Sequence, residues 1–279
     1  MSALELRGRV LVVAGSDSGG GAGIQADIKT VTALGGYAAT AITAITDQNT
    51  KGVHGVQPVA PQFVSSQIES ILTDIGADIT KTGMLGSGEV INAIAAALDK
   101  WGLNIPRVVD PVMVAKGGHS LITDDAVAFL KNRLVSGATV VTPNLPEAEV
   151  LTGLKVKTVA DMEAAASHLQ KLGAQAVLLK GGHLEGDHIV DMLITEDQIQ
   201  TFESSRIDST STHGTGCTLA SGIATSLAQG LSLVDSVARA RNFVITAIET
   251  APGLGKGYGP LNHGHTMRPG VSNEIVRPS

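Results

Sequence analysis

Short apolar runs that end in glycine or polar residues alternate along most of the chain with segments of helical periodicity. The first run, 9–15, is rich in β-branched residues, as is typical of a buried strand. The next segment, 23–34, places Ile24, Ile28 and Val31 on one helical stripe and ends at two glycines. Repetition of this unit predicts a parallel sheet, because successive parallel strands need a crossover connection.

The same alternation continues to the last third of the sequence. Further strands are predicted over 37–45, 78–82, 107–110, 139–142 and 176–180, and helices over 61–75, 88–101, 124–134, 161–172, 216–229 and 233–250. Short alternating segments between 188 and 205 predict a small antiparallel hairpin at one edge. We therefore expect an α/β fold with a doubly wound, mostly parallel central sheet, helices on both faces, and a single domain over 1–279.

Composition and charge exclude several classes of protein. Hydrophobic residues make up 43% of the 279 residues and charged residues 16%, so the chain can bury a large core and is not disordered. A formal net charge of −6 leaves no general basic surface for nucleic acid or an anionic membrane. With one cysteine, no apolar run of spanning length and no N-terminal signal, we expect a soluble cytoplasmic protein without disulfides.

The segment from Gly214 to Cys217 lies where a loop opens a helix. Free backbone N–H groups and the positive end of the helix can converge there on an anion. The same field is expected to lower the pKa of Cys217, which makes this cysteine a candidate base or polar activator. A small buried cysteine at a tight helix start is the structural alternative. Thr212 and His213 could add donors to phosphate oxygens.

Oxygen ligands follow two of the predicted strands. Asp110 and the pair Asn144 and Glu147 are groups that Mg²⁺ prefers near phosphate. Glu147 also follows Asn144 by three residues, so a helix N-cap with its capping-box partner is the alternative. Lys180 and Lys256, both beside glycines, could supply point charges for phosphate or could simply be solvated.

Two glycine- and histidine-rich stretches carry weaker signals. The glycines of 19–23 permit close approach of the backbone to a ligand, but they match neither the dinucleotide fingerprint nor a P-loop, and a structural turn is the usual outcome. His263 and His265 are interpreted as part of a surface tail, and no zinc site is assigned.

Taken together, these segments resemble the ribokinase-like superfamily, and within it the hydroxymethylpyrimidine and phosphomethylpyrimidine kinases of thiamine biosynthesis. The matching blocks are 14–27, 48–50, 81–85, 110–113, 142–148, 180–183 and 212–218. The resemblance implies ATP-dependent phosphorylation of 4-amino-5-hydroxymethyl-2-methylpyrimidine and then of its monophosphate at one site. It also implies ATP and Mg²⁺ as cofactors and a homodimer.

The resemblance further implies roles for individual residues. Gln48 would hydrogen-bond the aminopyrimidine and Met84 would pack on its ring. The other residues expected to bind substrate are Gly15, Asp17, Ala22 and Val112. Those expected near ATP are Asn144, Lys180, Thr212 and Lys256, with Asp110 and Glu147 at the metal. The expected catalytic group is Cys217 with the backbone amides of Gly214, Thr215 and Gly216, which would meet the developing charge.

Many ribokinase-like sugar kinases carry an aspartate base where this chain has Cys217, whereas the pyrimidine kinases resemble this chain in having cysteine. The glycine-rich segment 115–120 is interpreted as a flap that excludes water from the transferring phosphate, with an ordinary turn as the alternative. Two other functions remain open. One is a pyridoxal or pyridoxine kinase, and the other is a non-catalytic pyrimidine-binding protein on a retained kinase fold.

Overall fold

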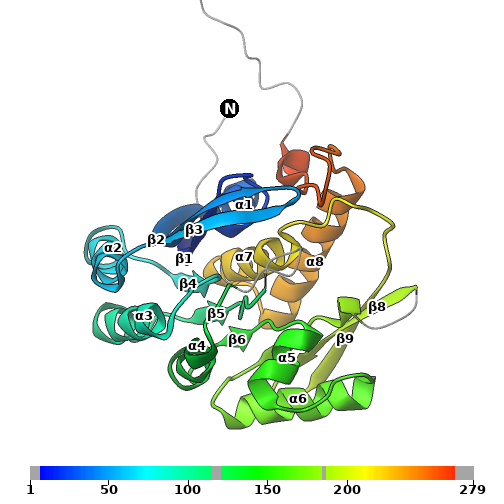
Figure 1. The fold of residues 1–279 in the computed structure, drawn as a ribbon. Helices are drawn as coiled ribbons and strands as arrows, with labels where there is room; N and C mark the ends of the chain where they lie inside the picture. The colour runs from blue at the N-terminus through cyan, green and yellow to red at the C-terminus, as the bar shows by residue number, and fades with distance from the viewer. Residues whose placement is uncertain (1–6, 115–120, 184–186, 268–279) are drawn as a thin grey trace, which may run out of the picture.

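The computed structural model describes residues 7–114, 121–183 and 187–267, which form a nine-stranded sheet between two layers of helices (Figure 1). The strands are β1 (Arg9–Asp17), β2 (Tyr37–Asn49), β3 (Gly52–Pro58), β4 (Ile79–Thr82), β5 (Arg107–Val109), β6 (Val140–Val141), β7 (Val177–Leu179), β8 (His188–Ile194) and β9 (Ile199–Ser205). Their order in the sheet is β3-β2-β1-β4-β5-β6-β7-β8-β9. The strands from β2 to β7 in this order pair in parallel, and the pairs at both edges are antiparallel.

The helices divide between the two faces of the sheet. They are α1 (Gly23–Ala33), α2 (Pro61–Asp74), α3 (Gly88–Trp101), α4 (Asp124–Phe129), α5 (Leu145–Thr152), α6 (Val159–Lys171), α7 (Thr215–Ala228) and α8 (Leu233–Glu249). Buried residues of α1, α7 and α8 pack on one face, and those of α2 to α6 pack on the other. Within the described ranges, no helix is long and apolar enough to cross a membrane.

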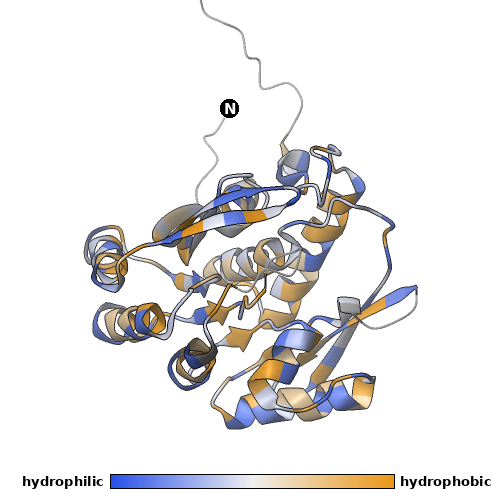
Figure 2. Ribbon diagram, in the orientation of Figure 1, coloured by the Kyte–Doolittle hydropathy of each residue, from blue (hydrophilic) through white to orange (hydrophobic). Residues whose placement is uncertain are grey.

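Strand β1 shows why the central strands are apolar throughout. Val10 and Val12 point into the layer of α1, α7 and α8, whereas Leu11 and Val13 point into the opposite layer. All four are at most 1% exposed. Burial of such a side chain contributes roughly 1.5–3 kcal/mol, so both faces favour aliphatic residues. Figure 2 shows β5 and β6 in the hydrophobic colour for the same reason.

The sheet has a switch point beside β1. From β1 the chain passes to β2 on one side, and it later returns to β4 on the other side of β1. Loops that leave the carboxyl ends of β1 and β4 therefore diverge, and open α/β sheets bind ligands in the crevice between such loops.

The predicted α/β fold, with its parallel centre and the edge hairpin formed by β8 and β9, is confirmed. A second antiparallel hairpin, β2 with β3, was missed, and it carries β2 on to Asn49, so that Gln48 lies on a strand. Residues of β3 are exposed or half-buried throughout, so this strand has no apolar alternation to reveal it.

Two further differences concern local structure. The predicted helix 124–134 is divided, since α4 continues as a π-helical turn over Leu130–Val135. The interpretation of His263 as part of a surface tail is wrong. This side chain is buried, lies 2.9 Å from Thr218 Oγ1 on α7 through its Nε2, and has its pKa lowered to about 4, chiefly by burial.

Candidate active site

A pocket of about 780 Å³ lies at the carboxyl ends of the parallel strands, where the switch point predicts it. Of the residues expected at the site, the following line this one pocket: Gly15, Asp17, Ala22, Gln48, Met84, Asp110, Val112, Asn144, Glu147, Lys180, Thr212, Gly214, Thr215, Gly216 and Cys217. Lys256 does not line the pocket. It lies in an exposed loop, where its backbone N–H donates to Thr50 Oγ1.

The start of α7 forms the turn that was expected to bind an anion. Gly214 is the N-cap with φ of +84°, and no side chain caps the helix. A Cβ at Gly214 would overlap the carbonyl oxygen of Gly21, so both the backbone conformation and the space require glycine. The N–H groups of the first helical turn have no partner within the helix, and the residues that carry them line the pocket at the positive end of α7.

Cys217 lies in that first turn and is half-buried at the pocket wall. The expectation that its pKa is lowered is wrong, because burial raises the pKa of the thiol to about 11. Lys81 and the backbone N–H of Gly23 oppose this rise, while the carboxylates of Asp27 and Asp110 add to it. The end of the helix alone predicts a lowered pKa, whereas the acidic groups that raise it lie far from Cys217 in the sequence.

A fully buried ion pair lies behind Cys217. Lys81 Nζ, on β4, is 2.9 Å from Asp27 Oδ1 on α1, and neither side chain is exposed. Ser221, one turn after Cys217 on α7, donates to the same oxygen at 2.6 Å. Asp27 and neighbouring charges raise the pKa of Lys81 despite its burial, so the lysine keeps its proton. A charged lysine, paired with Asp27, therefore lies near Cys217 at the start of α7.

Asp110, Glu147 and Lys180 form the charged wall of the pocket. Lys180 Nζ lies 3.0 Å from Asp110 Oδ1 and 3.9 Å from Glu147 Oε2. Burial raises the pKa of Glu147 to about 7, with Lys180 opposing and Asp110 adding to the rise. The structural alternative for Asn144 and Glu147 is confirmed, because they form a complete capping box at the start of α5. The capping box thus holds Glu147 beside Lys180.

Asp110 offers the clearest place for a cation. Its Oδ1 accepts hydrogen bonds from Thr142 and Lys180, whereas its Oδ2 is buried without a hydrogen-bond partner in the described chain. A buried carboxylate oxygen without a partner is costly unless a ligand or ion completes it. No group of three or more His, Cys, Asp or Glu residues in the described ranges could hold a metal. Mg²⁺ needs only one or two protein carboxylates, so Asp110 and Glu147 fit it.

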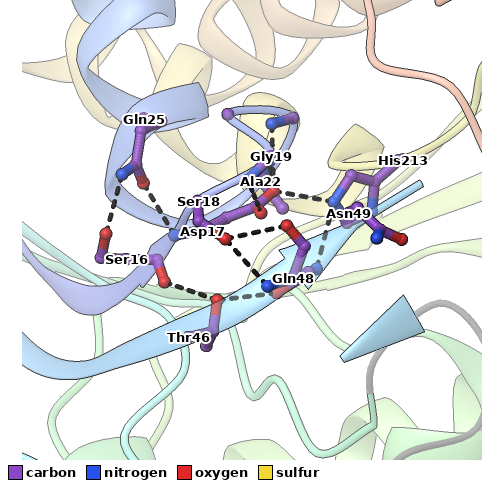
Figure 3. Close-up of polar contacts among 12 residues, drawn as sticks. Ser16, Asp17, Ser18, Gly19, Ala22, Gln25, Thr46, Gln48, Asn49 and His213 are labelled. Atoms are coloured by element: carbon purple, nitrogen blue, oxygen red, sulfur yellow. Dashed lines mark hydrogen bonds and ion pairs between the residues drawn. The ribbon is translucent and has the colours of Figure 1, made fainter. Parts of the chain in front are cut away.

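At the other end of the pocket, the glycine-rich loop folds around an internal anion (Figure 3). Asp17 is 2% exposed, and its carboxylate accepts backbone hydrogen bonds from Gly19, Gly21 and Ala22. Its Oδ2 also lies 2.9 Å from His213 Nε2. Burial alone would raise the pKa of Asp17, but the hydrogen bonds from His213 and from the backbone of the loop outweigh it and lower the pKa.

The ring-binding residues expected from the resemblance lie close to this loop. Gly15 is at an irregularity in the pairing of β1 with β2, and a Cβ there would come within 3.0 Å of Met84 Sδ. Gln48 projects from β2 toward His213 (Figure 3). The N–H of Ala22 is already used by Asp17, and its carbonyl accepts from Ala26. Gly15, Met84 and Gln48 thus surround one end of the pocket.

Several pocket residues were missed by the sequence argument. Apolar side chains of β8 and α8 also line the pocket, namely Ile189, Val244, Ile245 and Ile248. Arg241, also on α8, donates to Asp191 Oδ2 at 2.8 Å and lines the pocket beside it. The periodicity of α8 predicts a buried face but not that part of this face borders a ligand site. The predicted flap 115–120 lies outside the described residues.

Comparison with known proteins gives a consistent family. A family model described as phosphomethylpyrimidine kinase matches residues 17–262. A hydroxymethylpyrimidine/phosphomethylpyrimidine kinase of Bacillus subtilis is 46% identical over 256 residues, covering 91% of this chain and 94% of the relative. A thiamine biosynthesis bifunctional protein of Geobacter sulfurreducens is 54% identical over 257 residues. The match covers 92% of this chain but only 52% of that longer protein.

Solved structures show the same fold. A phosphomethylpyrimidine kinase from Clostridium difficile is 40% identical with a TM-score of 0.77, covering 86% of this chain and 99% of that one. An ADP complex of Bacillus subtilis pyridoxal kinase is 38% identical with a TM-score of 0.85, covering 92% and 98%. A Staphylococcus aureus pyridoxal kinase with AMP-PCP and pyridoxal is 35% identical with a TM-score of 0.86, covering 95% and 96%.

Proposed function

This chain belongs to the phosphomethylpyrimidine kinase family, and from that membership we propose that it phosphorylates 4-amino-5-hydroxymethyl-2-methylpyrimidine with ATP, and then phosphorylates the monophosphate. The observation that carries the proposal is that one pocket joins the ring-binding end, with Gln48 and Met84, to the anion-binding turn of α7. A flat ring held at the first end would direct its hydroxymethyl group toward the second.

Backbone amides carry most of the proposed chemistry. Phosphoryl transfer passes through a loose transition state, so positioning and stabilisation of charge dominate. The N–H groups of Thr215, Gly216 and Cys217 meet the charge that develops on the transferring group, supported by the buried ammonium of Lys81. Lys180, at 3.0 Å from Asp110, supplies a second positive charge for phosphate oxygens.

In this proposal Cys217 acts as a neutral polar group and not as a preformed thiolate base. With a thiol pKa of about 11, it is protonated at neutral pH and must lose that proton before it can act as a base. We therefore place it as the polar group that orients the attacking hydroxyl at the start of α7. Of the two roles left open by the sequence, base or polar activator, the raised pKa favours the second.

Mg²⁺ belongs to the proposal through Asp110 and Glu147. The unpartnered Oδ2 of Asp110 would hold the ion, and Glu147 lies nearby, with its Oε2 3.9 Å from the Lys180 Nζ that contacts Asp110. When bound, Mg²⁺ would neutralise charge on the phosphates of ATP. A homodimer, which the family resemblance implies, and a cytoplasmic location, which the cysteine count and the apolar pattern of the sequence indicate, remain predictions. Size-exclusion chromatography with light scattering would test the first.

The experiment is a coupled assay for ADP with purified protein, ATP and Mg²⁺. Hydroxymethylpyrimidine is supplied first and its monophosphate second, and the product masses are read in parallel. We expect one ADP for each phosphate added in both steps. No ADP with either substrate would refute the proposal and favour a non-catalytic pyrimidine-binding protein.

Pyridoxal phosphorylation is the second candidate, because two of the similar solved structures are named as pyridoxal kinases at 35% and 38% identity. Both substrates are flat heteroaromatic rings with a hydroxymethyl group, and the same pocket could orient either. The ratio of kcat/KM for the pyrimidine and for pyridoxal, measured on one preparation, decides between them. We expect the ratio to favour the pyrimidine.

A further inference from the structure

The pocket wall formed by β8 and α8 contains a buried ion pair that has no part in the proposed chemistry. Arg241 Nε, on α8, lies 2.8 Å from Asp191 Oδ2 on β8. Both residues are 8% exposed, and both line the pocket. Two well-packed apolar side chains can be as stable as a buried ion pair. Stability alone therefore does not account for charged residues at this place in the pocket.

The second oxygen of Asp191 holds the backbone next to Lys180. Asp191 Oδ1 accepts a hydrogen bond from the backbone N–H of Gly181 at 2.8 Å, and this contact is buried. A backbone N–H has one hydrogen, so the amide of Gly181 is committed to Asp191. A Cβ at Gly181 would overlap the carbonyl oxygen of Val190, so the backbone lies directly on β8 here. Asp191 thus fixes the chain immediately after Lys180.

The backbone of Lys180 is held at its own amide as well. Its N–H donates to the carbonyl oxygen of Pro143 at 2.9 Å. Two consecutive amides, those of Lys180 and Gly181, therefore each have a fixed partner, and together they set where the Lys180 side chain leaves the backbone. That side chain is 15% exposed and reaches Asp110 Oδ1 at 3.0 Å. The place of the ammonium in the pocket wall thus depends on the backbone as well as on Asp110.

Arg241 holds the carboxylate of Asp191 in the orientation that reaches Gly181. Its Nη2 donates to Ser204 Oγ on β9 at 3.2 Å, and its guanidinium lies 5.6 Å from the centre of the Phe202 ring. These contacts fix the planar guanidinium, whose Nε then donates to Asp191 Oδ2. Without Arg241 the carboxylate would be a buried negative charge with no cation, in a pocket proposed to receive phosphates.

We propose that Asp191 and Arg241 form a positioning pair that aims Lys180 at the phosphates of the nucleotide. This inference rests on the proposed function and deepens it. Arg241 orients the carboxylate of Asp191. That carboxylate holds the amide of Gly181, and with it the backbone from which Lys180 extends. The pair acts through Lys180 and needs no contact of its own with the reacting atoms.

The proposed role has a signature in nucleotide binding. The ammonium of Lys180 supplies a point charge to phosphate oxygens, so its contribution is larger for a triphosphate analogue than for a monophosphate. Displacement of Lys180 should therefore weaken AMP-PCP more than AMP, whereas a general disturbance of the pocket would weaken both. We define the phosphate selectivity as the Kd for AMP divided by the Kd for AMP-PCP, both measured with Mg²⁺.

The test measures this selectivity by isothermal titration calorimetry. The main variant combines Asp191→Ala with Arg241→Met, which removes the pair without changing the net charge. We expect the selectivity to fall by about tenfold. When the same two substitutions are made in Lys180→Ala, the further change should be less than about twofold, because the residue through which the pair acts is gone.

Two milder variants accompany the main one. Arg241→Lys keeps a charged donor for Asp191 and should retain most of the selectivity. Arg241→Gln removes the charge but keeps a donor, and should lower the selectivity in the same direction and with the same dependence on Lys180. It replaces the main variant if the combined substitution prevents folding.

Arg239→Met is the matched control on the same helix. Arg239 Nη1 donates to Gln229 Oε1 at 2.6 Å, and neither residue is among those that line the pocket in the described chain. This variant should leave the phosphate selectivity unchanged.

The outcomes separate the positioning role from the proposed function. An unchanged selectivity when the pair is removed would overturn the positioning role. An equal fall in the Lys180→Ala background, or in Arg239→Met, would also overturn it, because the effect would then not pass through Lys180. If the selectivity behaves as expected but the pyrimidine yields no ADP, the proposed function fails and the positioning role stands. A wild-type protein that does not bind AMP-PCP would refute both.

Discussion

Replacing Lys81 by methionine tests the buried charge beneath the anion-binding turn. Lys81 and Asp27 are completely buried and 2.9 Å apart, and Asp27 Oδ2 has no hydrogen-bond partner in the described chain. Removing the lysine therefore leaves a buried carboxylate with only Ser221 as a side-chain partner. Breaking a buried pair in this way costs about 3–5 kcal/mol, so we expect Lys81→Met to lose that much free energy of unfolding.

A double variant separates the cost of leaving Asp27 unpaired from the cost of changing the packing around Lys81. In Lys81→Met with Asp27→Leu both charges are gone, and two well-packed apolar side chains can be as stable as the ion pair. We expect the double variant to recover most of the loss. Urea unfolding measures all three proteins under one buffer condition. The reasoning is refuted if Lys81→Met loses less than about 1 kcal/mol, or if the double variant is no more stable than the single one.

The same variants report on Cys217. Lys81 lowers the pKa of the thiol by its charge and Asp27 raises it. Lys81→Met should therefore move the pH midpoint of alkylation by iodoacetamide upward, and the double variant should fall between it and wild type. Cys217 is the single cysteine of the chain, so the reaction needs no assignment. A midpoint that does not rise in Lys81→Met would show that the lysine does not act on the thiol.

Three other variants test separate parts of the site. Cys217→Ala should lower kcat by about 10²-fold while KM for the pyrimidine changes little, because loss of the orienting group misplaces the attacking hydroxyl. Cys217→Ser should retain more activity than alanine if the thiol acts as a polar group. A near-wild-type kcat for alanine would remove Cys217 from catalysis. Gly214→Ala places a Cβ at φ of +84° against the Gly21 carbonyl and should lower both the stability and kcat. Gly230→Ala is the control, because Gly230 has φ of +86° but lies in open space, so it should lose only the roughly 1–2 kcal/mol of backbone strain. Glu147 has a folded-state pKa of about 7 against 4.5 for the free group. The stability that its protonated form contributes to the fold is therefore fully present below pH 4.5 and is lost as the pH rises through 7. Glu147→Gln, which stays neutral, should therefore gain stability relative to wild type between pH 5 and pH 8 in urea unfolding, and a constant difference would contradict this.

Much of the fold follows from local patterns. The alternation of apolar runs and helical stripes predicts the parallel strands and the helices on both faces, because each strand must be apolar where both of its faces are covered. The pattern of apolar residues does not predict the hairpin of β2 and β3. Residues 52–58 bury little surface, so their pairing with β2 is decided by backbone hydrogen bonds that any sequence can make.

The candidate site divides in the same way. Glycines at a helix start, as at Gly214, and polar residues after strands mark the edge of the sheet where the pocket lies, and these signals are local. The pKa of Cys217 is different, since it depends on Asp27, Lys81 and Asp110, which come from three other elements. His263 likewise lies in a short segment without strand or helix periodicity, and its burial against Thr218 depends on contact with α7.

The order of residue types along the chain thus determined which segments become strands and helices and which loops gather at one rim, because these depend on short-range periodicity and on glycine. Tertiary structure alone decided the protonation of Cys217 and the pairing of Lys81 with Asp27. Those properties arise from burial and from distances of a few ångströms between residues far apart in sequence, and no local pattern encodes either quantity.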